Sequence, residues 1–340
     1  MLHVELVHIG EMLLTVSTLL KKSGVSMVNL EYITLYQTHT SLISVNVSAT
    51  IALSTNEVSL VGDWSKDSRT QIPKLPEDLE GSFLTMHNKS LIVGGRSKDT
   101  NKFYCLELDH GTWMKHSTLN EDRSKASVVT ADMGTFVFGG KAARRMDYEY
   151  LPNGSTSWKV GKSRIPLRVN NEFCCAITIP LDEHIWLIGA SSYHCIRLIL
   201  KFNINTHTFQ ELDIATEHFC KRCIAIPGTK KILITGDTVT SFNKKATATE
   251  ILDTENETIS NGPFLKIARA NYGIGIITID SEDRIAVFGG KTDNGVLLDS
   301  VEVYNTKIEK WTLTNMRLKK ADVFHGNVSL TGKIISDLLG

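Results

Sequence analysis

Short apolar runs recur along the chain at a nearly constant spacing, and each run ends at a glycine. The marks that close the runs are Gly94-Gly95, Gly139-Gly140, Gly189-Ala190, Gly236-Asp237 and Gly289-Gly290. Successive marks lie 45, 50, 47 and 53 residues apart. A second apolar mark follows each one after 18 to 22 residues, at Trp113, Trp158, Phe209, Ile259 and Trp311. Two marks in phase over five units predict a repeat architecture.

The second unit shows which elements one repeat contains. Residues 125–130 and 135–138 are rich in apolar and β-branched side chains and flank a turn. Residues 147–150 alternate polar and aromatic side chains, as a half-buried strand does. The Asn153-Gly154 pair, which tolerates positive φ, separates them from a fourth strand at residues 157–160. Each unit is therefore predicted to be a four-stranded antiparallel sheet of about fifty residues.

A single sheet of this size cannot bury both of its faces. Packing against the next sheet covers them, and repetition around an axis gives an all-β propeller. The glycine marks fit at the end of the second strand, where backbones crowd together. The tryptophans fit as apolar plugs between neighbouring blades. We interpret the following residues as structural marks of the repeat: Gly94, Gly95, Gly139, Gly140, Gly189, Gly236, Gly289, Gly290, Trp113, Trp158 and Trp311.

The pattern resembles the kelch repeat, in which four apolar residues precede a Gly-Gly pair and a spaced Tyr and Trp. Units one and two match it, with Tyr104 and Tyr148 at the tyrosine position. Unit five keeps the glycines and the tryptophan, with Tyr304 displaced, whereas units three and four depart from the pattern. The resemblance covers residues 50–340. It implies a kelch β-propeller and says little about function.

The two ends of the chain supply candidate strands for closing the ring. Residues 322–330 and 332–340 have the character of the first and second strands of a further blade, and residues 57–61 and 70–73 would be its third and fourth. A blade shared between the termini would remove exposed sheet edges. We therefore expect six four-stranded blades, the last one shared; five blades with peripheral extra strands is the alternative.

Residues 1–48 lack the repeat, so we expect an N-terminal extension followed by a propeller over residues 49–340. The apolar stretch at residues 12–20 is too short to span a bilayer. Acidic residues precede it and no small-residue cleavage site follows it, so it makes a poor signal peptide. We expect a short helix or strand against the propeller. No oligomerising or ubiquitin-ligase adaptor domain fits into this length.

Composition adds a few limits. The chain has 37 basic and 37 acidic residues, so bulk charge gives no reason to expect nucleic-acid binding. No stretch has transmembrane length, and we expect a monomeric propeller. Five Asn-x-Ser/Thr sequons occur, against about three expected by chance, which is too small an excess to place the protein outside the cell. We therefore expect a cytoplasmic location, with a secreted location as the alternative.

The cysteines are interpreted as buried, inert thiols. Cys220 and Cys223 have the two-residue gap of redox and zinc motifs, but they fall in a predicted strand, where residues three apart face opposite ways. Cys175 and Cys223 lie at nearly the same repeat position, which favours core packing. Reactive thiols need an exposed, electropositive setting. A disulfide stays open as an alternative.

The sequence contains no nucleophile elbow, phosphate-binding glycine loop or His-Glu-x-x-His motif. Histidines such as His194 and His218 are scattered, and no set of Tyr, His and Cys has the spacing of the copper site found in some kelch-like oxidases. We therefore predict no enzymatic activity, no cofactor and no metal. The expected function is protein–protein interaction as a scaffold or adaptor. The alternative is a secreted or luminal propeller with an enzymatic or carbohydrate-linked role.

The partner is expected to meet the loops between strands two and three and between blades, since loops on a rigid scaffold usually carry function. These loops are rich in basic residues, and the blade-connecting loops add more, Arg269 among them. The opposite rim leans acidic, with Glu255 and Glu257. We therefore predict an acidic peptide or surface as partner, centred on Arg144 and Arg145. The predicted contact residues are Arg96, Lys98, Lys141, Arg144, Arg145, Lys244, Lys245 and Lys291.

Overall fold

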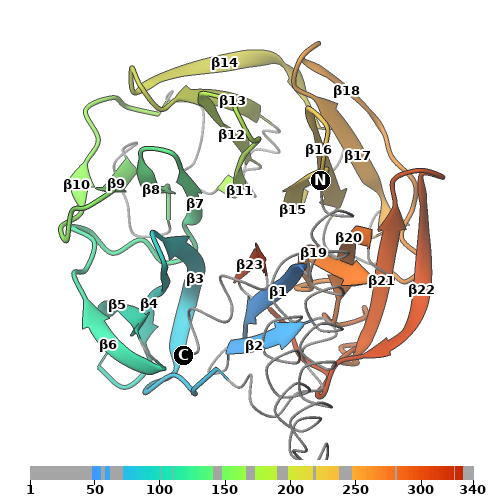
Figure 1. Cartoon of the computed structure of the whole chain (residues 1–340), viewed down its shortest axis with the longest axis horizontal. Helices are drawn as coiled ribbons and strands as arrows, with labels where there is room; N and C mark the ends of the chain where they lie inside the picture. The colour runs from blue at the N-terminus through green and yellow to red at the C-terminus, as the bar shows by residue number, and fades with distance from the viewer. Residues whose placement is uncertain are drawn as a thin grey trace, which may run out of the picture. The chain divides into compact units, whose positions relative to one another are not determined.

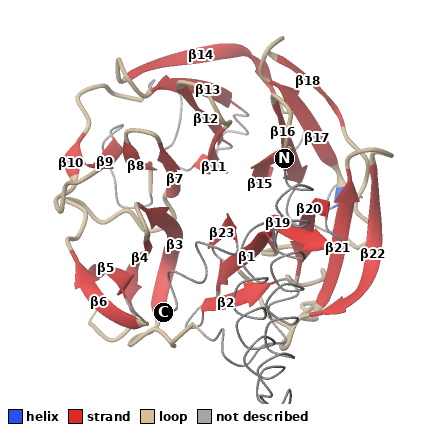
Figure 2. Cartoon of the chain, in the orientation of Figure 1, coloured by secondary structure: helices blue, strands red, loops and turns tan. Residues whose placement is uncertain are grey.

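The computed structural model describes residues 48–54, 58–61, 72–100, 102–109, 111–140, 148–165, 173–189, 198–216, 220–236, 247–279, 282–324 and 326–331. Residues 46–340 form one compact unit. Its described residues form five four-stranded antiparallel sheets and one three-stranded sheet. In Figure 1 the sheets surround a common axis, which is the arrangement of a β-propeller, and Figure 2 shows strands joined by loops.

The five four-stranded sheets are the blades, numbered in chain order. Blade 1 contains β3 (Leu79–His87), β4 (Ser90–Ser97), β5 (Phe103–Asp109) and β6 (Thr112–His116). Blade 2 contains β7 (Ser127–Ala131), β8 (Gly134–Phe138), β9 (Tyr148–Pro152) and β10 (Lys159–Val160). Blade 3 contains β11 (Phe173–Thr178), β12 (His184–Gly189), β13 (Leu198–Asn203) and β14 (Thr208–Ala215).

Blade 4 contains β15 (Cys220–Ala225), β16 (Lys231–Gly236), β17 (Thr249–Asp253) and β18 (Thr258–Asn261). Blade 5 contains β19 (Gly273–Ile279), β20 (Glu282–Phe288), β21 (Ser300–Asn305) and β22 (Lys310–Arg317). The three-stranded sheet, here called the closing sheet, contains β1 (Ser48–Leu53), β2 (Val58–Val61) and β23 (Gly326–Thr331). The four strands predicted for the second unit are the four strands of blade 2.

Burial follows the position of a strand within its blade. The second strands are nearly continuous apolar runs and are buried, as in β8 and β12, because neighbouring blades cover both of their faces. The outermost strands alternate, and β22 exposes every second side chain or more. The apolar run before each glycine mark is therefore the centre of its blade, which explains why the runs were the most visible signal in the sequence.

The closing sheet joins the two ends of the described propeller. β1 lies between β2 and β23, with Ile51 opposite Val328 and opposite Leu60. Ile51, Ala52 and Leu53 are fully buried. The prediction of a sheet that combines N- and C-terminal strands therefore describes real pairings, although the strands that form it differ from those expected.

The predicted count of six four-stranded blades differs from the structure, which has five. β2 and β23 coincide with two predicted strands, but β1 was assigned to none, because its short run Ser-Ala-Thr-Ile-Ala-Leu has no glycine mark after it. Ile72 and Pro73 form no strand, and proline cannot donate to a sheet ladder. The strand predicted at residues 332–340 lies outside the described residues, as does most of the extension over residues 1–48.

The glycine marks serve two different geometries. Gly139 and Gly140 have φ of 71° and 109°, and Gly289 and Gly290 have φ of 62° and 87°, a region that favours glycine. A Cβ on Gly140 would lie 2.7 Å from the Arg123 Cα, so the backbones approach closely. Gly94 and Gly95 lie within β4 instead, where a Cβ on Gly95 would lie 2.8 Å from the Leu79 Cβ.

The tryptophan marks lie at the seams between blades. Trp158 of blade 2 is 5% exposed and packs in a cluster with Phe83 and Cys105 of blade 1. Trp311 of blade 5 is 2% exposed and packs in a cluster with Leu233 of blade 4. Trp113 is only partly buried, and its indole N–H donates to the Pro73 carbonyl at 2.8 Å. Phe209 and Ile259 occupy the equivalent seams of blades 3 and 4.

Candidate functional site

The strand two–three loops and the blade connections lie together on one side of the propeller, here called the loop face. In blade 5, Ala270 and Lys291 exchange two backbone hydrogen bonds of 2.9 Å, and the Gly290 N–H donates to the Asp322 carbonyl at 2.8 Å. In blade 2, the Arg123 guanidinium donates to the Gly139 carbonyl at 3.1 Å. Each of these contacts joins a strand two–three loop to a blade connection.

Three of the predicted contact residues lie in the described part of this face. Arg96 forms an ion pair with Asp122, and Lys98 lies 3.7 Å from Asp78. Lys291 has an exposed side chain, while its backbone pairs with Ala270. The remaining predicted contacts, the expected centre included, lie outside the described residues: Lys141, Arg144, Arg145, Lys244 and Lys245.

The loop face is less basic than the sequence count indicated. Asp78, Asp122 and Asp322 were not counted. Only the fold brings Asp78 next to Lys98 and Asp122 next to Arg96, whereas Asp322 follows Lys320 by two residues. Arg317 also pairs with Asp299 at 3.7 Å, and Lys320 with Asp322 at 3.8 Å. Exposed pairs contribute only about 0–1 kcal/mol each, but they reduce the net positive field.

Arg269 is not a surface charge, contrary to its place among the basic loops. It is fully buried, with its Nη2 donating to Glu302 Oε1 at 2.7 Å. The same carboxylate accepts the backbone N–H groups of Lys266 at 2.6 Å and Ile267 at 3.0 Å. Burial lowers the pKa of the Arg269 guanidinium, and the Glu302 carboxylate opposes that shift. The pair fixes the connection between blades 4 and 5.

Blade 2 contains an equivalent buried arginine–glutamate pair. The Arg123 Nε donates to Glu149 Oε1 at 2.8 Å, and both side chains are fully buried. Glu149 also accepts the backbone N–H groups of Asn120 at 2.6 Å and Glu121 at 3.1 Å. In both blades a buried carboxylate therefore holds the loop that precedes the blade. This role escaped the sequence analysis, since neither glutamate stands out in its strand.

Exposed apolar side chains are the second feature of the loop face that the sequence analysis missed. Phe264 is 65% exposed in the connection between blades 4 and 5. Val296 and Leu297 are 59% and 46% exposed in the strand two–three loop of blade 5. That loop is held in shape by backbone hydrogen bonds, among them Thr292 N–H to the Val296 carbonyl at 2.9 Å. An aromatic residue directly after Gly262-Pro263 in a predicted loop was the available signal.

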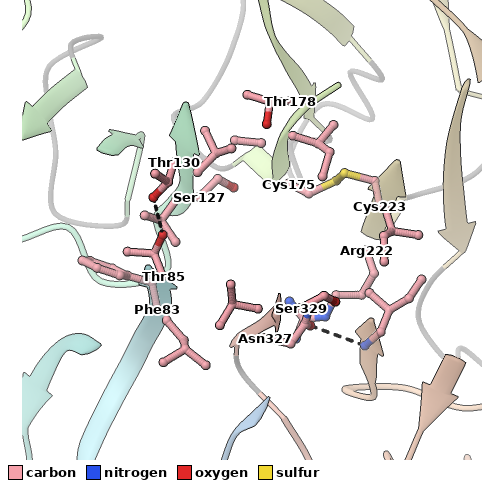
Figure 3. Close-up of a pocket in the computed structure, with 18 of the residues that line it drawn as sticks. Phe83, Thr85, Ser127, Thr130, Cys175, Thr178, Arg222, Cys223, Asn327 and Ser329 are labelled. Atoms are coloured by element: carbon pink, nitrogen blue, oxygen red, sulfur yellow. Dashed lines mark hydrogen bonds between the residues drawn. A yellow bond between two sulfur atoms is a disulfide. The ribbon is translucent and has the colours of Figure 1, made fainter. Parts of the chain in front are cut away.

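A cavity of about 370 Å³ lies at the centre of the ring. The innermost strands line it, namely β3, β7, β11, β15, β19 and β23, as Figure 3 shows. Hydroxyl groups on its wall include Thr85 and Thr130, whose oxygens lie 2.9 Å apart. Arg222 is the one formally charged residue of the lining, all of which lies in the described part of the chain.

Arg222 reaches from blade 4 to two other parts of the ring. Its Nε donates to the Tyr272 carbonyl at 3.2 Å, just before β19, and its Nη2 donates to the Phe324 carbonyl at 2.8 Å, just before β23. Figure 3 shows the side chain directed toward Asn327 and Ser329 across the cavity from Thr85. The guanidinium therefore lies at a junction between blade 4, blade 5 and the closing sheet.

Cys175 and Cys223 form a disulfide, so the interpretation of these two residues as inert thiols was wrong. They lie on β11 and β15, the innermost strands of blades 3 and 4, with their Cα atoms 6.1 Å apart. Their equal repeat position was the useful signal: equivalent positions on adjacent blades face each other across a seam. Cys105 is a free, buried thiol, and burial raises its pKa to about 12, as expected for an inert cysteine.

Within the ranges that the structure describes, no three His, Cys, Asp or Glu side chains lie close enough together to hold a metal ion. No helix in those ranges is long and apolar enough to cross a bilayer.

No protein-family model matches this chain, and no curated protein matches it. The structure establishes the β-propeller fold. The resemblance to the kelch repeat depends on the repeat pattern of the sequence.

Proposed function

We propose that this protein is a protein-interaction module of the kelch type that binds its partner through the loop face, and that it is not an enzyme. The observation that supports this most is the exposure of Phe264, Val296 and Leu297 in two loops of the loop face, which also carry the exposed Lys266 and Lys291. Exposed aromatic and aliphatic side chains on an ordered loop are typical anchors of protein interfaces. Propellers present such loops on a rigid scaffold.

The partner that fits this group has an apolar centre with acidic residues around it. Phe264 would enter an apolar pocket of the partner, and Lys266 and Lys291 would meet carboxylates at the rim. Such rim charges mainly steer association and select partners. The balanced total charge gives no support for nucleic acid as a partner. A monomeric propeller that presents one face is the assembly we propose.

We further propose that the closing sheet acts as a sixth blade. Its strands β1 and β23 pack beside β19 and β3, the innermost strands of blades 5 and 1, so it occupies the gap between these two blades. Three strands in place of four still pack against the innermost strands of blades 5 and 1, which an open ring would leave uncovered.

The test is partner capture with paired variants. A Phe264→Ala and Val296→Ala double variant is compared with Leu181→Ala, which removes a 97% exposed side chain from a strand one–two turn on the opposite face. We expect at least a tenfold loss of affinity for the partner, since interface anchors contribute about 2 kcal/mol or more, with no loss for Leu181→Ala. Equal losses, or none, would contradict the proposed face.

Charge reversal tests the acidic partner separately. Lys266→Glu with Lys291→Glu, and Arg144→Glu with Arg145→Glu, should slow association and flatten its dependence on salt. Glu255→Lys with Glu309→Lys, in strand three–four turns on the opposite face, is the matched control. A slower association caused by the control pair would show that general charge, and not the loop face, governs binding.

The disulfide favours a second candidate, a secreted or luminal propeller with an enzymatic or carbohydrate-linked role. Disulfides persist mainly in oxidising compartments. The cytoplasmic location expected from the sequence stays a prediction beside it. Expression with and without a secretory leader separates the two: the secretory product should be oxidised at Cys175–Cys223 and glycosylated at the exposed Asn88 and Asn256, and should alone be stably folded. A stable product with reduced cysteines from cytoplasmic expression would support the cytoplasmic location.

A further inference from the structure

The central cavity is built like a small-molecule site. Four half-buried aliphatic side chains form its wall, and each comes from a different sheet: Val128, Ile177, Ile276 and Val328. Binding sites for small molecules are typically concave and mostly apolar, with a small number of placed polar groups. At about 370 Å³ the cavity has room for about twelve water molecules of about 30 Å³ each, which is enough for a small organic molecule.

Several polar groups of the cavity have defined positions. Asn327 Oδ1 accepts the Ile274 N–H at 3.4 Å, and the Ser329 hydroxyl accepts the Ile276 N–H at 2.7 Å. Thr85 and Thr130 bond to each other on the opposite wall. These oxygens already serve the backbone or a neighbour, so they shape the cavity more than they select its occupant.

Arg222 gives the cavity a positive charge, with no acidic residue in the lining. Its position is fixed from several sides. Two carbonyls, those of Tyr272 and Phe324, orient the guanidinium. The Thr235 hydroxyl donates to the Arg222 carbonyl at 3.2 Å, and the next residue, Cys223, is bonded to blade 3 through the disulfide. A guanidinium held in this way suits a carboxylate, to which it can donate a charge-assisted hydrogen bond.

We propose that the central cavity binds a small organic carboxylate with an apolar body, its carboxylate directed toward Arg222 and its body against Val128, Ile177, Ile276 and Val328. This site lies inside the ring and is independent of the loop face. A neutral molecule of the same shape gains the apolar contacts but no charge-assisted hydrogen bond, so the site should select for the anion.

The first experiment compares matched ligands on the unaltered protein. Hexanoate and 3-phenylpropionate are titrated calorimetrically at millimolar concentrations beside hexanamide and 3-phenylpropionamide. We expect each carboxylate to bind roughly tenfold or more tightly than its amide, because charge-assisted hydrogen bonds are about twice as strong as neutral ones. Equal affinity within a pair, or binding of none of the four, overturns the proposal, and so does a ratio that stays the same in an Arg222→Gln variant.

Variants locate the binding. Arg222→Lys keeps the charge and should weaken carboxylate binding only partly, whereas Arg222→Gln should remove the preference over the amide. Ala225→Phe fills the cavity and should abolish binding of all four ligands, while Leu181→Phe, outside it, should change nothing. If the Ala225→Phe variant still binds the ligands, the proposed location of the site in the central cavity is wrong. If Arg222 only tied blades together, Arg222→Gln would lower stability, and the unaltered protein would not distinguish acid from amide.

Discussion

Blades 2 and 5 are stabilised differently from blade 3, although all three have the same strand order. Blades 2 and 5 each contain a buried arginine–glutamate pair, Arg123–Glu149 and Arg269–Glu302, and a Gly-Gly pair with positive φ beside it. In blade 3 the position of those glutamates is taken by Leu200, which lies opposite Leu187 as Glu149 lies opposite Val137. Blade 3 therefore has no arginine–glutamate pair at that position.

The seam between blades 3 and 4 carries the disulfide, and the tryptophan mark is replaced there by the smaller Ile259. In blades 2 and 5, buried polar bonds and a large indole hold the blade to its neighbour. Between blades 3 and 4, a covalent bond crosses the seam. One architecture thus tolerates different local solutions, because each blade contacts only the next one along the ring.

The largest effect is expected from breaking one buried pair. Glu302→Leu alone should lower the free energy of unfolding by about 3–5 kcal/mol, because Arg269 would be left charged and buried. The double variant Arg269→Met with Glu302→Leu should recover part of that loss, since it removes both charges. Urea unfolding measures both. Glu282→Ala, which breaks the exposed pair of Glu282 with Lys307, is the control and should change the free energy of unfolding very little.

The tryptophan marks should rank by their burial. Trp158→Ala and Trp311→Ala should each cost roughly 3–5 kcal/mol, the range for large aromatic deletions in a core. Trp113→Ala should cost less, because Trp113 is only partly buried, and so should Ile259→Ala, which removes fewer atoms. Thermal unfolding of the four variants gives the order. A Trp311→Ala protein with native stability and lost partner binding would reverse the structural assignment.

Removing the disulfide should weaken the seam between blades 3 and 4. Cys175→Ser with Cys223→Ser should cost about 2–4 kcal/mol, since the bond closes a long segment of the unfolded chain. A reducing agent should lower the melting temperature of the unaltered protein and leave the double variant unaffected. Cys105→Ala is the control: its thiol is free and buried, so sensitivity to the reducing agent should persist. Equal sensitivity of the double variant would contradict the assigned bond.

The smallest effect concerns the seam between blades 1 and 2, which is polar. The His87 Nδ1 lies 3.1 Å from the Thr135 hydroxyl, and its Nε2 has no hydrogen-bond partner among the described residues. Burial and, to a lesser degree, His116 lower the pKa of His87 below its ordinary value of 6.5. The folded state thus favours the neutral ring, and this contribution to stability is present above pH 6.5 and is lost as the pH falls below it.

We expect the free energy of unfolding to fall by up to about 1.4 kcal/mol per pH unit below that value because of His87. Chemical unfolding at a series of pH values measures the slope. The pKa of His207 is lowered as well, so the contribution of His87 is the difference between the unaltered protein and His87→Gln. Identical slopes for the two proteins would show that His87 does not take part.

The sequence by itself determined the propeller fold and the strand order of its five four-stranded blades, but not the blade count, which was predicted as six. An apolar run and the glycine after it mark the second strand of each blade in the sequence. The run is apolar because neighbouring blades bury it, and the glycine is needed because backbones approach closely there. The tryptophans could be placed at seams for the same reason. These signals are local and repeat five times, so a single chain suffices to find them.

Only the tertiary structure decided how distant residues meet. β1 pairs with β23 across nearly the whole chain, and no local signal marks β1. The acidic neighbours of two predicted contact bases escaped the sequence analysis for the same reason, because Asp78 and Asp122 come close to Lys98 and Arg96 only when the strands pair. The disulfide and the cavity around Arg222 each join two or more blades, and each buried arginine–glutamate pair joins a blade to the connection that precedes it. Their geometry depends on the closed ring, which sequence spacing does not encode.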